Sequence, residues 1–185
     1  PLLFTRRSIR EGGEPIALGE EEVIALIEAV CAGGCVELVD FEMNNDPGHI
    51  AQVRAAARAR GVALVLSYHN FQSTPAQEVL CQRFAQAQAL GADVAKIAVM
   101  PQRLEDVLSV LGATLASSQT LDIPLVSMSM GGYGALTRLF GWTFGSAMSF
   151  VVGAGTSAPG QVPIADMNAV LEIMQRSLAV QAVQS

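Results

Sequence analysis

The chain has 185 residues, of which 51% are hydrophobic and 15% are charged, and its formal net charge is -6. This length suits one domain with a sizeable core, and an acidic chain without a lysine- or arginine-rich cluster argues against nucleic acid as a partner. No apolar run approaches the roughly 20 residues that cross a bilayer, and the N-terminus lacks the basic-then-apolar pattern of a signal peptide. The three cysteines show no metal-binding or redox spacing, so we expect reduced thiols and a cytoplasmic protein with no membrane partner.

Short apolar runs alternate with amphipathic stretches along the chain. The predicted strands are residues 1–8, 35–43, 62–70, 94–100, 123–130 and 146–153. The predicted helices are residues 19–32, 49–61, 74–91, 103–118, 135–141 and 165–178. Strands covered by helices on both faces read as nearly continuous apolar runs, so six βα units predict an α/β protein with a parallel sheet. An open doubly wound sheet and a (β/α) barrel both remain possible at this point.

Polar side chains gather where the predicted strands end. An open sheet commonly carries a glycine-rich phosphate turn after its first strand, and the segment EGGE found there is not of that type. A barrel instead places its functional groups at the C-terminal ends of several strands. The polar residues at or beyond strand ends are Thr5, Arg7, Glu11, Asp40, Glu42, Ser67, His69, Lys96, Ser127, Ser129, Ser157 and Gln161. Because alternate residues of a strand share a face, Asp40 lies with Glu42 and Ser67 with His69.

Lys96 is the only lysine in the chain and lies inside the apolar run 94–100. Burial disfavours the charged form of an amine, which makes the neutral amine available as a nucleophile for a carbonyl substrate. An arginine could not serve in this way, since it stays protonated. A lysine that reaches the sheet edge with its charged end is the structural alternative.

His69 ends another apolar strand and is a candidate general base with a pKa near neutrality. Asp40 or Glu42, on the neighbouring strand, could hold its ring, and a core histidine is the alternative. Arg7 and Arg138 are candidates for gripping a substrate carboxylate. No His/Cys pair stands at ligand spacing, so no metal site is expected.

Six segments together resemble one enzyme family. They are LLFTRRSIREGGE, VELVDFEM, SYHNFQSTP, GADVAKIAVMPQ, VSMSMGGYGALTRLFG and SAPGQ, and they follow the family order across nearly the whole chain. The chain resembles type I 3-dehydroquinate dehydratase, the Schiff-base-forming 3-dehydroquinase of the shikimate pathway. The resemblance implies a lyase that dehydrates 3-dehydroquinate to 3-dehydroshikimate in aromatic amino acid biosynthesis. It also implies a TIM barrel, no cofactor or metal, and a homodimer.

The resemblance also implies residue roles. Lys96 matches the Schiff-base lysine, His69 the proton-transferring histidine, and Glu11 the glutamate that partners this histidine. Asp40 matches the acidic residue behind the histidine, and Arg138 the arginine that binds the substrate carboxylate. The other pocket-lining positions are Arg7, Met130, Ser157 and Gln161, the last two on a loop that closes over the ligand.

The chain departs from the family pattern at two points. It has six of the eight βα units, so residues 1–185 are expected to form one partial TIM-barrel catalytic domain that lacks the first two. Arg6 stands where the family usually has an apolar or aromatic residue. Two alternatives stay open: another Schiff-base barrel of the class I aldolase kind, and a catalytically silent homologue that binds a ligand.

Overall fold

Five parallel strands form the sheet, in the order in which they occur in the chain. The computed structural model describes residues 1–153 and 160–182. The strands are β1 (Leu3–Thr5), β2 (Leu38–Glu42), β3 (Ala63–Asn70), β4 (Val94–Val99) and β5 (Leu125–Ser129), each paired with the next. A doubly wound sheet reverses its strand order at a switch point, whereas a barrel adds each strand beside the last. The sequential order therefore identifies a barrel-type α/β fold.

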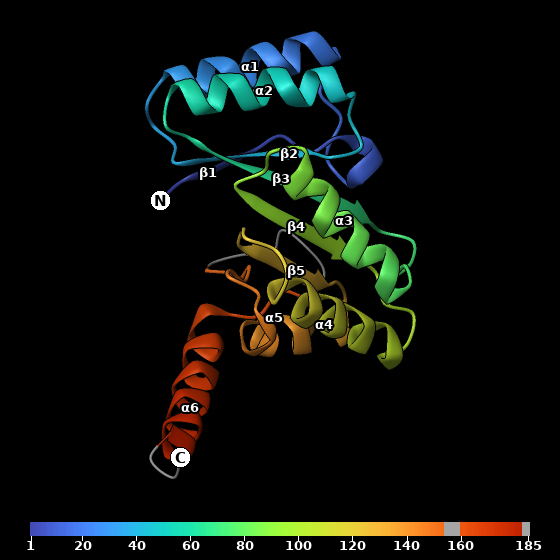
Figure 1. The fold of residues 1–185 in the computed structure, drawn as a ribbon, viewed down its shortest axis with the longest axis vertical. Coiled ribbons are helices and arrows are strands. Elements are labelled where there is room, and N and C mark those ends of the chain that lie inside the picture. The colour runs from blue at the N-terminus through green and yellow to red at the C-terminus, as the bar shows by residue number, and fades with distance from the viewer. Residues whose placement is uncertain (154–159, 183–185) are drawn as a thin grey trace.

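The helices follow the strands as the apolar periodicity predicts. They are α1 (Glu20–Ala32), α2 (Pro47–Ala59), α3 (Gln77–Ala89), α4 (Leu104–Ser118), α5 (Ala135–Phe140) and α6 (Ile164–Ala182), with short 3-10 turns η1 (Ile9–Glu11), η2 (Gly132–Gly134) and η3 (Gly141–Phe144). Helices α1 to α4 lie along one side of the sheet, and α6 projects away from it (Figure 1). Within the described residues, no helix is both long and apolar enough to cross a membrane.

The two sides of the sheet differ in what they bury. Along β4, Ala95, Ile97 and Val99 join the large apolar cluster that packs the sheet against the helices. The alternate residues Val94 and Ala98 belong to a second, smaller apolar cluster on the opposite side. Because alternate side chains of a strand point to opposite faces, Lys96 lies on the side of Val94 and Ala98. The inner side of the sheet therefore carries the polar groups.

The predicted strand over residues 146–153 is wrong. This segment contributes only single bridges, from Ser146 to Leu125 and from Val152 to Pro163. The hydroxyl of Ser146 accepts a hydrogen bond from the backbone amide of Ser127 at 3.2 Å. In a β-ladder a backbone carbonyl of the neighbouring strand accepts this bond. Since the side chain satisfies this amide, pairing with β5 stops after one bridge. The described residues thus hold five strands of the barrel rather than six.

Candidate active site

A cavity of about 360 Å³ opens on the inner side of the sheet, at the C-terminal ends of the strands. It is lined by seven of the residues that the sequence predicts for the site: Arg7, Glu11, His69, Lys96, Met130, Arg138 and Gln161. Residues from β1, η1, β3, β4, β5 and α5 meet there, which is where barrels place their functional groups. Ser157 lies outside the described residues. The strand-end rule therefore located the cavity from sequence.

Lys96 is buried in this cavity and faces a carboxylate. Its side chain is 7% exposed, and its Nζ donates to Oδ2 of Asp40 at 2.9 Å. Arg7 donates to the other oxygen of Asp40 at 2.8 Å, and Ser67 donates to that same oxygen at 2.5 Å. The sequence predicts a desolvated amine, and the structure adds a fixed negative charge beside it. That charge stabilises positive charge on Nζ, in an ammonium or in an iminium.

Asp40 stays ionised despite complete burial. Burial alone would raise the pKa of its carboxyl group. The charges of Lys96 and Arg7 and the hydrogen bond from Ser67 act in the opposite direction and prevail, so the pKa of Asp40 lies below its ordinary value. The cavity therefore has an anionic floor beneath the lysine.

Glu11 holds the imidazole of His69. Its Oε2 accepts from the backbone amide of His69 at 3.0 Å and lies 2.9 Å from Nδ1 of the same residue. A carboxylate can only accept, so Nδ1 carries a proton and Nε2 of a neutral ring carries the lone pair. Asn44 donates to the other oxygen, Oε1, at 2.8 Å and fixes the carboxylate from behind. This geometry presents Nε2 as a base.

Burial lowers the pKa of His69 below its ordinary value. The hydrogen bond to Glu11 raises it, and the nearby cations Arg7 and Lys96 lower it further. The net shift keeps the ring neutral at neutral pH, which is the state that accepts a proton. Sequence reasoning expects a pKa near neutrality, and the structure moves it to the acidic side.

Arg138 lines the same cavity and is 2% exposed. Burial lowers the pKa of its guanidinium below the usual range. One of its nitrogens donates to the carbonyl of Phe150 at 3.0 Å and approaches the sulfur of Met128 at 3.7 Å. The ring of Phe150 lies 4.7 Å from Nζ of Lys96. A buried guanidinium in a cavity with a lysine and a base suits a substrate that has both a carboxylate and a carbonyl group.

Comparison with known proteins decides the family. The chain matches the family model described as Type I 3-dehydroquinase over residues 1–178. The chain belongs to this family. Within the described residues, no group of three or more His, Cys, Asp or Glu side chains could hold a metal ion.

Several 3-dehydroquinate dehydratases are closely similar in sequence and fold. A 3-dehydroquinate dehydratase of Albidiferax ferrireducens is 60% identical over 178 residues, which cover 96% of this chain and 67% of that protein. The crystal structure of the 3-dehydroquinate dehydratase from Geobacillus kaustophilus matches with a TM-score of 0.93 at 52% identity, over 95% of this chain and 68% of that one. A type I enzyme from Clostridium difficile, with covalently modified comenic acid, matches with a TM-score of 0.91 at 39% identity, over 96% of this chain and 70% of that one. Against these proteins the five strands form part of a TIM barrel.

The 3-dehydroquinase cavity also corrects one prediction made from strand positions. Asp40 and Glu42 were the candidates on the neighbouring strand for holding His69, but Glu11 does so. Asp40 binds Lys96 and Arg7, and Glu42 accepts from Arg7 at 3.2 Å and from the amide of Ser8 at 2.6 Å. Both carboxylates of β2 are thus bonded to the cations Lys96 and Arg7, and Glu11 holds the imidazole of His69 instead.

Two contributors escaped the sequence reasoning. Asn44 follows the end of β2 by two residues, so the rule that located the other polar groups would have included it. Phe150 lies in the segment predicted as a strand and carries no sequence signal for contact with Lys96. Asn44 acts through Glu11, whereas Phe150 lines the cavity and contacts Lys96 with its ring and Arg138 with its carbonyl.

Proposed function

We propose that this cavity dehydrates 3-dehydroquinate to 3-dehydroshikimate, with Lys96 as nucleophile, His69 as proton-transfer group and Glu11 as the residue that orients His69. One observation carries the proposal. A buried amine lies in the same cavity as an imidazole whose Nδ1 is engaged by a carboxylate, which leaves Nε2 to act as a base. This is the pair of groups that Schiff-base dehydration needs.

The reaction then proceeds in balanced steps. The ammonium group of Lys96 first transfers a proton to Nε2 of His69. The resulting amine adds to the ring ketone, and the adduct's hydroxyl group leaves as water with that proton, which gives an iminium and restores the neutral imidazole. The iminium withdraws electrons, so the adjacent carbon loses a proton to Nε2 of His69 and an enamine forms. The enamine expels the neighbouring hydroxyl group, which leaves as water with the proton from His69. Hydrolysis of the remaining iminium releases the product and restores Lys96.

Asp40 and Arg7 adjust the charge around the nitrogen. Asp40 lies 2.9 Å from Nζ, so its negative charge stabilises the iminium as it forms. Arg7 balances Asp40 and Glu42, which lie on the same side of β2. With these charges fixed before substrate enters, little reorganisation is needed during the reaction.

The remaining site residues bind the substrate. Arg138 is assigned to the carboxylate, because a guanidinium can grip it through two parallel hydrogen bonds. Met130 lines the apolar side of the cavity, and Gln161 supplies a polar group at its rim. Ser157, which lies outside the described residues, is proposed as a further substrate contact because of the family resemblance.

Borohydride trapping tests the assignment of Lys96. The protein is incubated with 3-dehydroquinate, reduced with borohydride and weighed, and the modified peptide is sequenced. We expect one substrate-sized adduct on Lys96, and none in Lys96→Ala, whose turnover should fall by at least about a thousandfold. An adduct elsewhere, or turnover retained in Lys96→Ala, would contradict the assignment.

The same experiment separates the two alternatives. A silent homologue would bind 3-dehydroquinate tightly and give no adduct. A barrel of the class I aldolase kind would form adducts with small aldehydes or ketones and would not release 3-dehydroshikimate. The engaged His69 favours the dehydratase, since it supplies the base that abstracts a ring proton.

We further propose that residues 1–185 act as one catalytic domain, in a homodimeric cytoplasmic enzyme. The support is the family resemblance together with the cysteine and charge pattern. Light scattering coupled to size-exclusion chromatography tests the dimer, and a monomer at micromolar concentration would contradict it.

A further inference from the structure

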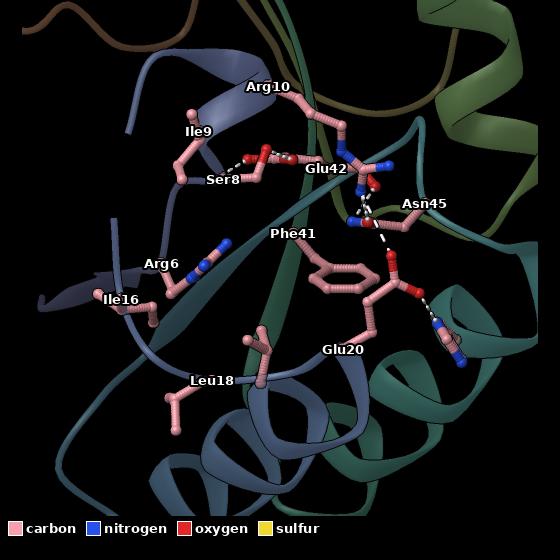
Figure 2. A pocket seen from close by; sticks show the side chains of 12 residues that line it. Arg6, Ser8, Ile9, Arg10, Ile16, Leu18, Glu20, Phe41, Glu42 and Asn45 are labelled. Carbon is pink, nitrogen blue, oxygen red and sulfur yellow. Dashed lines mark hydrogen bonds and ion pairs between the residues drawn. The ribbon is translucent and has the colours of Figure 1, made fainter. Parts of the chain in front are cut away.

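A second cavity, of about 270 Å³, lies on the helix side of β1 and β2, away from the catalytic cavity. Figure 2 shows it between the end of β1, the segment that leads into α1, and Phe41 of β2. Arg6 and Arg7 are adjacent in sequence, and their side chains line different cavities: Arg6 this one and Arg7 the catalytic one. This division follows from the alternation of side chains along extended backbone.

Arg6 carries a charge that the described residues leave unneutralised. Its Nε is buried and has no hydrogen-bond partner within residues 1–153 and 160–182. In Figure 2, no dashed line reaches its guanidinium, which points into the cavity. The other charged side chains of the cavity have partners: Arg10 pairs with Glu20, and Glu42 pairs with Arg7. The imidazole of His49 also lies beside Glu20 and Glu21. Among the described residues, Arg6 is therefore the charged side chain of this cavity that forms no ion pair.

The walls around Arg6 are apolar and accessible. Ile9, Ile16 and Leu18 are 62%, 41% and 38% exposed, although all three are large hydrophobic side chains. Phe41 and Val23 form a buried apolar floor beneath them. Water contact with such side chains is unfavourable, and a buried guanidinium nitrogen without a partner is unfavourable as well. A ligand that relieves both must have an anionic end and an apolar body.

We propose that this cavity is a binding site for a small carboxylate with an apolar body. Arg6 grips the carboxylate through its planar fork of donors, and Ile9, Ile16 and Leu18 cover the body. The volume equals that of about nine water molecules, which suits a ligand of roughly ten non-hydrogen atoms. For a ligand of that size, the dissociation constant is expected to be of millimolar order.

Benzoate is the probe that tests this site, because it has a carboxylate and an apolar ring of the right size. Binding is measured by calorimetry, and its location by the shifts of backbone amide NMR signals. We expect benzoate to saturate the site and to shift the amides of residues 16–18 more than those of β4. Benzyl alcohol, which lacks the charge, and acetate, which lacks the ring, should each bind at least about tenfold more weakly.

Three variants decide which arginine is responsible. Arg6→Gln should weaken benzoate binding by at least about tenfold. Arg10 is already paired with Glu20. The dissociation constant of benzoate for Arg10→Gln should therefore stay within about threefold of that of the parent protein. Arg138→Gln, which alters the catalytic cavity, should also stay within about threefold. Circular dichroism confirms that each variant is folded.

The proposal is overturned by any of three results. The first is that benzoate fails to saturate the site at about 50 mM, a concentration well above the expected dissociation constant. The second is that Arg6→Gln binds benzoate as tightly as the parent protein does. The third is that Arg138→Gln loses benzoate binding, which would place benzoate in the catalytic cavity. None of these results depends on turnover, so the proposed dehydratase activity stands or falls separately.

Discussion

Replacing Asp40 by asparagine removes the negative charge on the floor of the catalytic cavity and keeps the size of the side chain. Lys96 loses its ion pair at 2.9 Å, whereas Arg7 keeps Glu42 at 3.2 Å. Removing one partner of a buried ion pair typically destabilises a protein by about 3–5 kcal/mol. Because one of the two cations keeps a carboxylate, we expect the free energy of unfolding to fall by about 3 kcal/mol, at the lower end of that range.

Urea unfolding at pH 7, followed by circular dichroism, measures this change. The double variant Asp40→Asn with Lys96→Met should regain at least about 1 kcal/mol, since it leaves no unpaired charge on Lys96. Glu20→Gln is the matched control, because this carboxylate is 67% exposed and should change stability by less than about 1 kcal/mol. A loss below about 1 kcal/mol in Asp40→Asn, with no gain in the double variant, would refute the reasoning.

The pH dependence gives an independent check on the same residue. The pKa of Asp40 is lower in the folded protein than its ordinary value of 3.8. The stability that comes from its ionisation is therefore fully present above the unfolded pKa and is lost as the pH falls through the folded pKa. The difference between the parent protein and Asp40→Asn should be constant from about pH 5 to 7 and should shrink below about pH 4. A difference that already shrinks near pH 6 would point to another group.

Three further predictions concern the base. His69→Ala should lower kcat by about a hundredfold or more, while borohydride still traps the substrate on Lys96; loss of the adduct would show an earlier role. The acidic limb of kcat should lie below pH 6.5, and Glu11→Gln should move it to lower pH, because the bond from Glu11 raises the pKa of His69; an unmoved limb would exclude this contact. Asn44→Ala should lower kcat about two- to tenfold, against little change in Asn45→Ala, since Asn44 alone of the two holds Glu11; equal effects would remove its positioning role.

The strands and helices were predictable wherever the local sequence pattern alone determines the secondary structure. Five apolar runs became strands and all six amphipathic stretches became helices, because burial on both faces of a sheet and on one face of a helix leaves a local pattern. Residues 146–153 have the same apolar composition, but pairing there depended on which group satisfied the amide of Ser127. The hydroxyl of Ser146 took it, and composition holds no record of that competition.

The same distinction applies to the site. Alternation along a strand was enough to gather Asp40, Ser67 and Lys96 on one side of the sheet, because the direction of each side chain follows from its position. Alternation did not predict which side chains pair with each other, since pairing depends on distances between elements that strand positions do not give. The resemblance, and not the strand positions, pointed to Glu11 as the partner of His69. Glu11 reaches His69 from a 3-10 turn that folds back over the strand ends, 58 positions earlier in the chain.

The opposite directions of Arg6 and Arg7 make the end of β1 intolerant of length changes. One residue inserted between Leu3 and Arg6 would reverse the sides of both guanidinium groups. Arg6 would then take the place of Arg7 beside the catalytic carboxylates, Arg7 would turn toward the cavity that Arg6 now lines, and Ser8 would move away from Glu42, which accepts from its amide and hydroxyl. Recombination or loop grafting in this region should therefore keep the spacing from Leu3 to Ser8, even where the residue types are exchanged.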